Sequence, residues 1–378
     1  MTLDAPRKCF IHIGPHKTGT TSIQRFLAKN TDLLSKRGVY FPLLKNNGIA
    51  SNHNILMASR GLASDGTVRR NGKGWSGIER VLKQGEKNIL LSHETFALKI
   101  TNSATLNSII QLFDENNYSI HIIAYVRSQP DWLNSWYVQQ QKRLYAKNTF
   151  MEFVDKWFET GRADPVRYLN GLMDHPKIQL EVVSFDMAVK TGLEVDFCRR
   201  LGVEPDSDWK FPARINSNVG AKTIYVAQRV MVGSEILSPN SEIHGEVKAA
   251  LRAAMRKHQW REKPYMALSD DIARSIRERY EVSNREFLSR FPIGNYEDVF
   301  PSRTYVQNVV DPSTIPDPER LEIEAVVDKI LRTIKRRARR DKREKRRMAR
   351  AGGDEAMKIA RGPELIRRPS ERELFSSQ

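Results

Sequence analysis

Residues 14–21 have the types and spacing of a phosphate-binding loop, because they read GPHKTGTT. Gly14 and Gly19 match the two glycines of the nucleotide-binding pattern G-x-x-x-x-G-K-[ST], and Thr21 matches its hydroxyl residue. Thr20, however, stands where that pattern has its lysine, and the lysine of this chain is Lys17. The displacement argues against ordinary ATP hydrolysis and favours a different phosphorylated donor.

The segments around this loop predict how it would hold an anion. Residues 9–13 are apolar and predict a buried strand, and a helix is expected to begin at Thr20 or Thr21. Backbone N–H groups at such a junction bind phosphate, and the hydroxyls of Thr18, Thr20 and Thr21 would add donors. Lys17 would then lie beside the transferred group, where charge develops on the leaving phosphate. The alternative is a glycine-rich turn with a solvated lysine.

A second anion site is predicted after the most apolar strand, residues 120–126. Arg127 follows that strand directly, and Ser135 comes eight residues later, about two turns into the next helix. A guanidinium fork suits phosphate, and a hydroxyl adds a further donor. Together they could hold a second phosphate at a distance from the first. The alternative is a surface arginine and a serine that bonds its own helix backbone.

Two residues are candidates for a general base. Glu94 follows the predicted strand at 88–92, and a carboxylate at a strand end that faces an anion site can accept a proton from a hydroxyl. His53 is the competing candidate. Each residue could instead have a structural role: Glu94 could begin a helix, and His53 could be a structural histidine. His12, inside the first strand, is expected to be a core histidine, and no cluster has the spacing of metal ligands.

Residues 11–24, which read IHIGPHKTGTTSIQ, resemble the 5′-phosphosulfate loop of sulfotransferases that use 3′-phosphoadenosine 5′-phosphosulfate (PAPS). Those enzymes also carry an arginine and a serine, eight residues apart after a central strand, for the 3′-phosphate of the donor. Arg127 and Ser135 have that spacing. Residues 182–186 and 197–202 are similar to later segments of the family. The resemblance covers residues 8–220 and extends toward residue 300.

The resemblance implies PAPS as donor, no metal, and sulfuryl transfer to an acceptor hydroxyl. The family uses histidine as base in cytosolic small-molecule enzymes and glutamate in many carbohydrate enzymes, so Glu94 favours a carbohydrate acceptor such as a polysaccharide or glycolipid. The late basic, glycine-containing segment of the family has its nearest candidate at residues 214–218. The alternatives are a P-loop kinase or nucleotide-binding protein with a degenerate loop, and a basic scaffold that binds anionic polymers.

The chain predicts an α/β fold of three layers, P-loop-like, with a central parallel sheet, a helical C-terminal region and a basic tail. Apolar strands are expected at 9–13, 39–42, 88–92, 120–126 and 178–185, with helices between them, and a loop at 60–78. A sulfotransferase domain over 1–310 would be followed by a helix at 311–350 that becomes polybasic. Residues 351–378 are polar and are expected to be disordered.

Charge and composition place limits on the chain. Its 378 residues carry a net charge of +17, of which +10 lies between Arg332 and Arg350. The basic segment is therefore a local feature, either solvated or in contact with an anionic surface or polymer. Cys9 and Cys198 are expected to be buried thiols. No signal peptide or membrane-spanning run is evident, so we expect a soluble, cytoplasmic protein. The oligomeric state is left open.

Overall fold

The computed structural model describes residues 6–46, 49–51, 62–70, 75–92, 103–213, 219–260 and 263–350. The chain separates into two compact units. The first contains Met1–Leu133, Trp157–Ile215 and Arg274–Arg303, and the second contains Asn134–Lys156, Asn216–Ala273 and Thr304–Gln378. The predicted division of the chain at residue 310 stays a prediction.

A parallel sheet forms the centre of the first unit. Among the described residues it has five strands in the order β2-β5-β1-β6-β7. The strands are β1 (Arg7–Ile13), β2 (Val39–Tyr40), β5 (Asn88–Ser92), β6 (Tyr118–Val126) and β7 (Ile178–Ser184). Their apolar runs follow from burial on both faces. The predicted α/β fold with a central parallel sheet is confirmed.

The register of the sheet brings the carboxyl ends of its inner strands to one edge. His12 of β1 pairs with Ser92 of β5, and Ile13 pairs with Ala124 of β6. Val126, the last residue of β6, pairs with Ser184 of β7. In parallel α/β sheets, ligands bind beyond this edge, where the strand order reverses. Here the chain leaves β1 at that edge and continues into the loop at 14–19.

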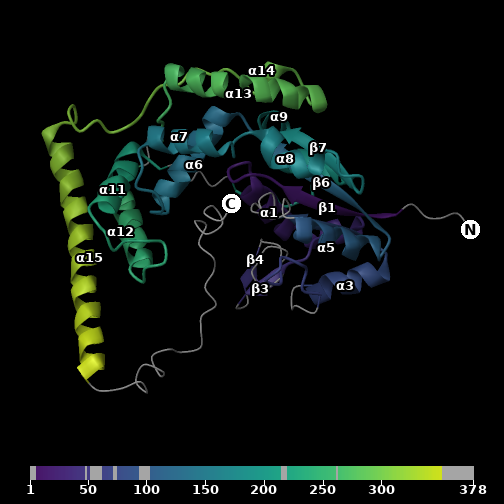
Figure 1. The fold of residues 1–378 in the computed structure, drawn as a ribbon, viewed down its shortest axis with the longest axis horizontal. Helices are drawn as coiled ribbons and strands as arrows, with labels where there is room; N and C mark the ends of the chain where they lie inside the picture. The colour runs from purple at the N-terminus through teal and green to yellow at the C-terminus, as the bar shows by residue number, and fades with distance from the viewer. Residues whose placement is uncertain are drawn as a thin grey trace, which may run out of the picture. The chain divides into compact units, whose positions relative to one another are not determined.

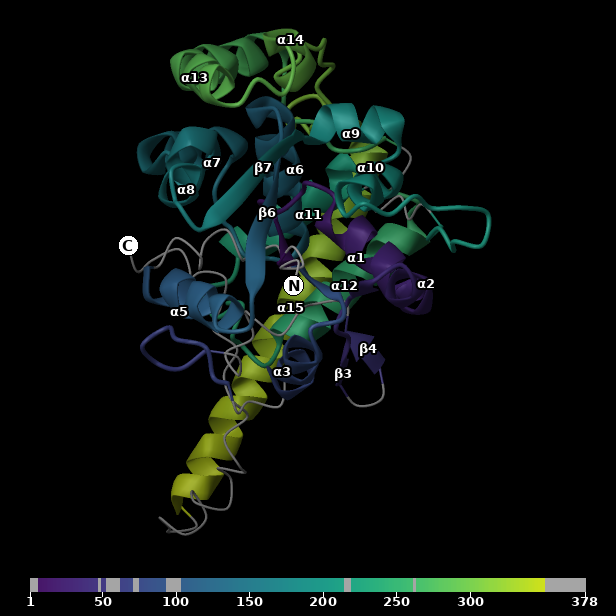
Figure 2. The same cartoon turned by 90° about the vertical axis from the view of Figure 1, so that its right-hand side faces the viewer.

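Helices cover both faces of the sheet. Ile78, Leu82, Ile109 and Leu169 pack on one face, whereas Phe26 and Phe197 pack on the other. Figure 2 shows this division around β6 and β7. The first layer contains α3 (Trp75–Gln84), α5 (Ser103–Asp114) and α8 (Pro165–Met173). The second contains α1 (Thr20–Lys29), α2 (Thr31–Lys36), α9 (Phe185–Thr191) and α10 (Leu193–Arg200).

The second unit is helical. Its long C-terminal helix, α15 (Asp317–Arg350), lies beside α11 (Ala221–Val232) and α12 (His244–Lys257), as Figure 1 shows. Apolar side chains of α15 are buried every three or four residues, at Ile323, Val327, Ile330 and Ile334. This spacing makes one apolar stripe along the helix, and the stripe attaches α15 to its neighbours.

The remaining elements connect or extend these parts. They are the hairpin of β3 (Leu44–Asn46) and β4 (Ile49–Ser51), and the helices α6 (Gln129–Lys142), α7 (Phe150–Thr160), α13 (Asp270–Arg290) and α14 (Tyr296–Val299).

One sequence expectation is wrong. The loop predicted at 60–78 gives way to α3 at Trp75, because Ile78 and Leu82 form an apolar helical face that packs on the sheet. Both cysteines are buried free thiols, as predicted. Within the described part of the chain, no helix is both long and apolar enough to span a membrane.

Candidate anion-binding site

The loop between β1 and α1 is a tight backbone turn. Lys17 and Gly19 both have left-handed backbone conformations, with φ of 74° and 76°. Gly14 is required by close approach, since a Cβ there would lie 2.5 Å from Thr18 Oγ1. Thr18 is buried, and its hydroxyl donates to the carbonyl of Pro15 at 2.8 Å. The Thr18 hydroxyl thus closes the turn in this structure.

Two side chains hold the loop carbonyls. The indole Nε1 of Trp132 donates to the carbonyl of His16 at 2.6 Å, and Nη1 of Arg127 donates to the carbonyl of Lys17 at 2.9 Å. The Arg127 guanidinium also lies 5.1 Å from the centre of the Phe185 ring. Arg127 is therefore next to the loop, on the sheet edge where it was predicted. The carbonyl of Lys17 thus faces the positively charged side chain of Arg127.

The first turn of α1 is suited to binding an anion. Gly19 is the N-cap residue and has no side chain to accept from the helix N–H groups, and the first turn holds no acidic residue. Thr20 is only 3% exposed, and its Oγ1 has no hydrogen-bond partner among the described residues. A helix N-terminus carries partial positive charge, and a buried hydroxyl is stabilised by a partner. An anion at this turn would supply both needs.

Helix α10 supports the loop from one side. A Cβ on Gly19 would lie 2.2 Å from Leu193 Cδ2, so Leu193 packs directly against the glycine. The hydroxyl of Ser22, in the first turn of α1, donates to the carboxylate of Glu194. These contacts come from adjacent residues at the start of α10. The start of α10 therefore fixes the end of the loop and the beginning of α1.

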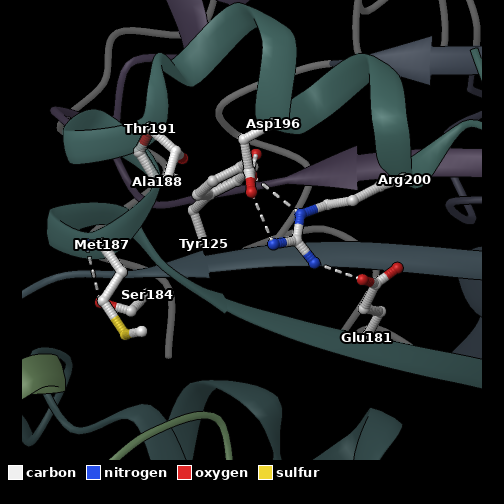
Figure 3. Close-up of polar contacts among 8 residues, drawn as sticks. All are labelled: Tyr125, Glu181, Ser184, Met187, Ala188, Thr191, Asp196 and Arg200. Carbon is white, nitrogen blue, oxygen red and sulfur yellow. Dashed lines mark hydrogen bonds and ion pairs between the residues drawn. The ribbon is translucent and has the colours of Figure 1, made fainter. Parts of the chain in front are cut away.

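A polar network ties the same helix to the sheet (Figure 3). The hydroxyl of Tyr125, in β6, donates to Asp196 at 3.1 Å, and Arg200 donates to both oxygens of Asp196 at 2.9 Å. Arg200 also pairs with Glu181 of β7. Burial, and secondly the charge of Asp196, raise the pKa of Tyr125 well above its ordinary value. Sequence reasoning missed this network, because Tyr125 and Asp196 are 71 residues apart along the chain.

His12 has a structural position, as predicted. It is fully buried, its Nδ1 lies 2.8 Å from the Ser92 hydroxyl, and its ring meets Phe197 at 4.9 Å between centroids. Gln24 also bonds the Ser92 hydroxyl, at 3.2 Å. Burial lowers the pKa of His12 to about 3, so the ring is neutral at physiological pH. The group is therefore not a proton acceptor for bound substrate.

The other predicted site residues have separate outcomes. Glu94 and His53 lie outside the described residues, although Ser92 brings the chain to the edge where the loop begins. Thr21 is exposed in the first turn of α1. Ser135 lies in α6 and belongs to the second unit. Residues 214–218 are also outside the described part.

A small pocket beside the loop was not anticipated. It is lined by Pro15 of the loop, Arg127, Trp132, Arg162 and Tyr168. Its volume of about 10 Å³ admits about one water molecule, so the two guanidinium groups add positive charge beside the loop rather than form a ligand cleft. In the described ranges, no group of histidine, cysteine, aspartate and glutamate side chains could hold a metal ion.

No protein-family model matches this chain, and a search of curated proteins finds no relative. Two solved structures are similar to it. The sulfotransferase from Alicyclobacillus acidocaldarius is 17% identical, with a TM-score of 0.32, covering 55% of this chain and 87% of its own. The sulfotransferase domain from the curacin biosynthetic pathway is 13% identical, with a TM-score of 0.32, covering 73% of this chain and 98% of its own. At this level of similarity, neither likeness identifies an activity or a substrate for this chain.

Proposed function

We propose that the protein is a sulfotransferase that moves a sulfuryl group from PAPS to an acceptor hydroxyl on a carbohydrate. The observation that carries the proposal is the uncapped first turn of α1, with the buried Thr20 hydroxyl and a loop that contains Lys17. This arrangement fits one phosphate. The phosphate would be the 5′-phosphate of the donor, held by N–H groups of the loop and the first turn.

The loop favours PAPS over ATP as the donor. In nucleotide triphosphatases, the residue after the second loop glycine is the lysine that reaches the β- and γ-phosphates. In this chain that residue is Thr20, which is buried and neutral. Lys17 instead belongs to the turn itself, with a left-handed backbone. The position from which a lysine would contact the β- and γ-phosphates of a triphosphate therefore holds no lysine. This disfavours the alternative of a P-loop kinase.

The proposed chemistry is an in-line displacement at sulfur. The acceptor oxygen forms a bond to sulfur, and the bond from sulfur to the 5′-phosphate oxygen breaks. Glu94, or alternatively His53, would take the proton of the acceptor hydroxyl. Lys17 and the N–H groups of α1 would stabilise the charge that arrives on the leaving phosphate. Lysine thus supplies the positive charge that Mg²⁺ supplies to ATP in kinases.

Arg127 would hold the 3′-phosphate of the donor, whereas the part assigned to Ser135, which belongs to the second unit, stays a prediction from the sequence. A guanidinium has five N–H donors in a fixed fork, so one group can bond a backbone carbonyl and a phosphate at once. The bond from Arg127 to the Lys17 carbonyl would then couple the 3′-phosphate site to the loop that holds the 5′-phosphate. ATP has no 3′-phosphate, so this second contact would select the donor.

Ligand-induced stabilisation tests the proposal. The thermal midpoint is measured with adenosine 3′,5′-bisphosphate, with adenosine 5′-monophosphate and with Mg-ATP, since a ligand that binds the folded form raises the midpoint. We expect the bisphosphate to stabilise most. In Arg127→Gln and in Ser135→Ala, its advantage over the monophosphate should shrink. A stronger response to Mg-ATP than to the bisphosphate would reject the proposal.

The Arg127 variant also separates two roles of that residue. If Arg127 only braced the loop, both adenosine ligands would lose affinity equally. If it also binds the 3′-phosphate, the bisphosphate loses more. Ser135→Ala is the second test variant, because it would remove a proposed donor to the 3′-phosphate while leaving the bond from Arg127 to the Lys17 carbonyl in place. A screen of polysaccharide and glycolipid acceptors with labelled PAPS would then identify the hydroxyl that is sulfated.

A further inference from the structure

The second half of α15 carries a dense group of exposed cations. Residues 335–343 contain six Lys and Arg side chains that are exposed to solvent: Lys335, Arg336, Arg339, Arg340, Lys342 and Arg343. We refer to these six as the outer basic face. None of them forms an ion pair with another described residue, whereas Arg337, between them, pairs with Glu242 at 3.2 Å and Asp341 at 3.0 Å.

The outer basic face points away from the body of its unit. At 3.6 residues per turn, the six cations occupy an arc of roughly 160° around the helix. The buried stripe of Ile323, Val327, Ile330 and Ile334 lies roughly opposite the middle of that arc. Arg337 extends the attached side, through its pairs with Glu242 and with Glu246 of α12. Attachment on one side leaves the cations together on the other.

The attachment also makes the face a fixed array rather than a loose tail. Arg229 of α11 pairs with Glu324 at 2.7 Å, and Lys222 pairs with Glu319 at 2.9 Å. The Trp260 indole donates to Glu322 at 2.9 Å. These contacts hold the acidic first half of α15, and the apolar stripe continues to Ile334. The cations that follow are therefore presented on a helix whose orientation in the unit is set.

We propose that the outer basic face binds the anionic headgroups of a phospholipid bilayer. A straight helix with all its cations on one side can bring them to a plane of headgroups at the same time. The phosphates of a nucleic-acid duplex follow curved strands, so a straight row would meet only part of them. Clusters of four to eight Lys and Arg on a helix bind anionic lipid at about 1 kcal/mol per residue near the surface.

The binding is adsorption rather than insertion. The outer basic face contains no apolar or aromatic residue, whereas helices that enter the bilayer interface bring an apolar side to it. The apolar stripe of α15 is already used against its own unit. Attraction therefore comes from charge alone, and salt should weaken it. The Debye length falls from about 10 Å at 0.1 M salt to about 3 Å at 1 M.

Vesicle co-sedimentation of the full chain tests the proposal. Phosphatidylcholine vesicles are compared with vesicles in which one lipid in four is phosphatidylglycerol, at low and high salt. We expect binding to the anionic vesicles only, and loss of binding at high salt. The triple variant Arg336→Gln, Arg339→Gln and Arg343→Gln should bind about 100-fold more weakly, from three contributions of about 1 kcal/mol.

Two control variants keep the result specific. Lys36→Gln, Lys83→Gln and Lys257→Gln remove the same charge from exposed positions elsewhere and should bind like the wild type. The triple variant Arg336→Lys, Arg339→Lys and Arg343→Lys keeps the charge and should preserve binding even if the glutamine variant folds poorly. Equal losses in the two glutamine triples would overturn the proposal. Binding to neutral vesicles would also overturn it. A competition experiment gives a third such outcome: duplex DNA or anionic polysaccharide releases the protein from anionic vesicles at a lower concentration of negative charge than added anionic vesicles do.

Discussion

Lys17 is the residue on which the proposed chemistry depends most. It lies in the turn that precedes α1, and its backbone carbonyl is held by Arg127. In the proposed function, its side chain would bring positive charge to the place where the leaving phosphate develops negative charge. A charge that is positioned before the reaction lowers the barrier without reorganisation during it.

Removing the Lys17 amine should therefore lower turnover. We expect Lys17→Ala to reduce sulfuryl transfer from labelled PAPS by about 10²-fold or more, the usual loss for one such electrostatic donor. Lys29→Ala, at an exposed position in the last turn of α1, is the control and should have little effect. Turnover of Lys17→Ala at the wild-type rate would exclude the assigned role.

At the scale of elements, α10 holds the loop, α1 and the sheet together. Its first residue packs on Gly19, its second bonds Ser22, and Asp196 bonds Tyr125 and Arg200. The side chains of Asp196 and Arg200 are 17% and 24% exposed, so the pair is screened far less than a surface pair. The position of the loop thus depends on a helix that follows it by more than 170 residues.

Loss of Asp196 should destabilise the fold. We expect Asp196→Ala to lower the free energy of unfolding by about 2 kcal/mol, below the roughly 3–5 kcal/mol for fully buried pairs because of the partial exposure. Urea unfolding would measure it. Asp206→Ala is the control, since Arg37 and Asp206 are 45% and 46% exposed and such pairs contribute under about 1 kcal/mol. An equal loss of unfolding free energy in the two variants would contradict this prediction, because the network around Asp196 would then contribute no more than a surface pair.

At the scale of the whole molecule, the buried His12 makes the fold sensitive to acid. The ring is enclosed between the sheet and α10, so it can take up a proton only when the fold opens. Its pKa is about 3 in the folded chain and about 6.5 when unfolded. Between these values the unfolded chain binds one more proton than the folded chain. The stability from a neutral His12 is complete above about pH 6.5 and declines as the pH falls toward 3.

The size of this effect can be measured. From pH 7 to pH 5, the wild type should lose about 2 kcal/mol more unfolding free energy than His12→Asn, at 1.36 kcal/mol per pKa unit. His121→Asn is the control, since burial lowers the pKa of His121 as well but that ring is only half-buried. Parallel stability curves for the wild type and His12→Asn would contradict the prediction.

The sequence predicted the central part of the fold well, for a physical reason. Strands that are buried on both faces must be apolar throughout, so residues 9–13, 88–92 and 120–126 were visible as uninterrupted runs. The helix after the loop was visible through its glycine and threonine residues. Helix α3 was missed because glycines near it indicated a loop, whereas its burial depends on a sheet far away in the chain.

What the sequence determined by itself is local: the glycine spacing of the loop, the place of Lys17 and Arg127 after strands, and the charge of the last helix. Adjacent residues suffice for these features, because they depend on backbone freedom and on the side chains present. The tertiary structure alone decided that Arg127 bonds the Lys17 carbonyl, that α10 packs on Gly19, and that the cations of α15 face outward. Such contacts join residues distant in the chain, and only the packing of helices on the sheet and on one another brings them together.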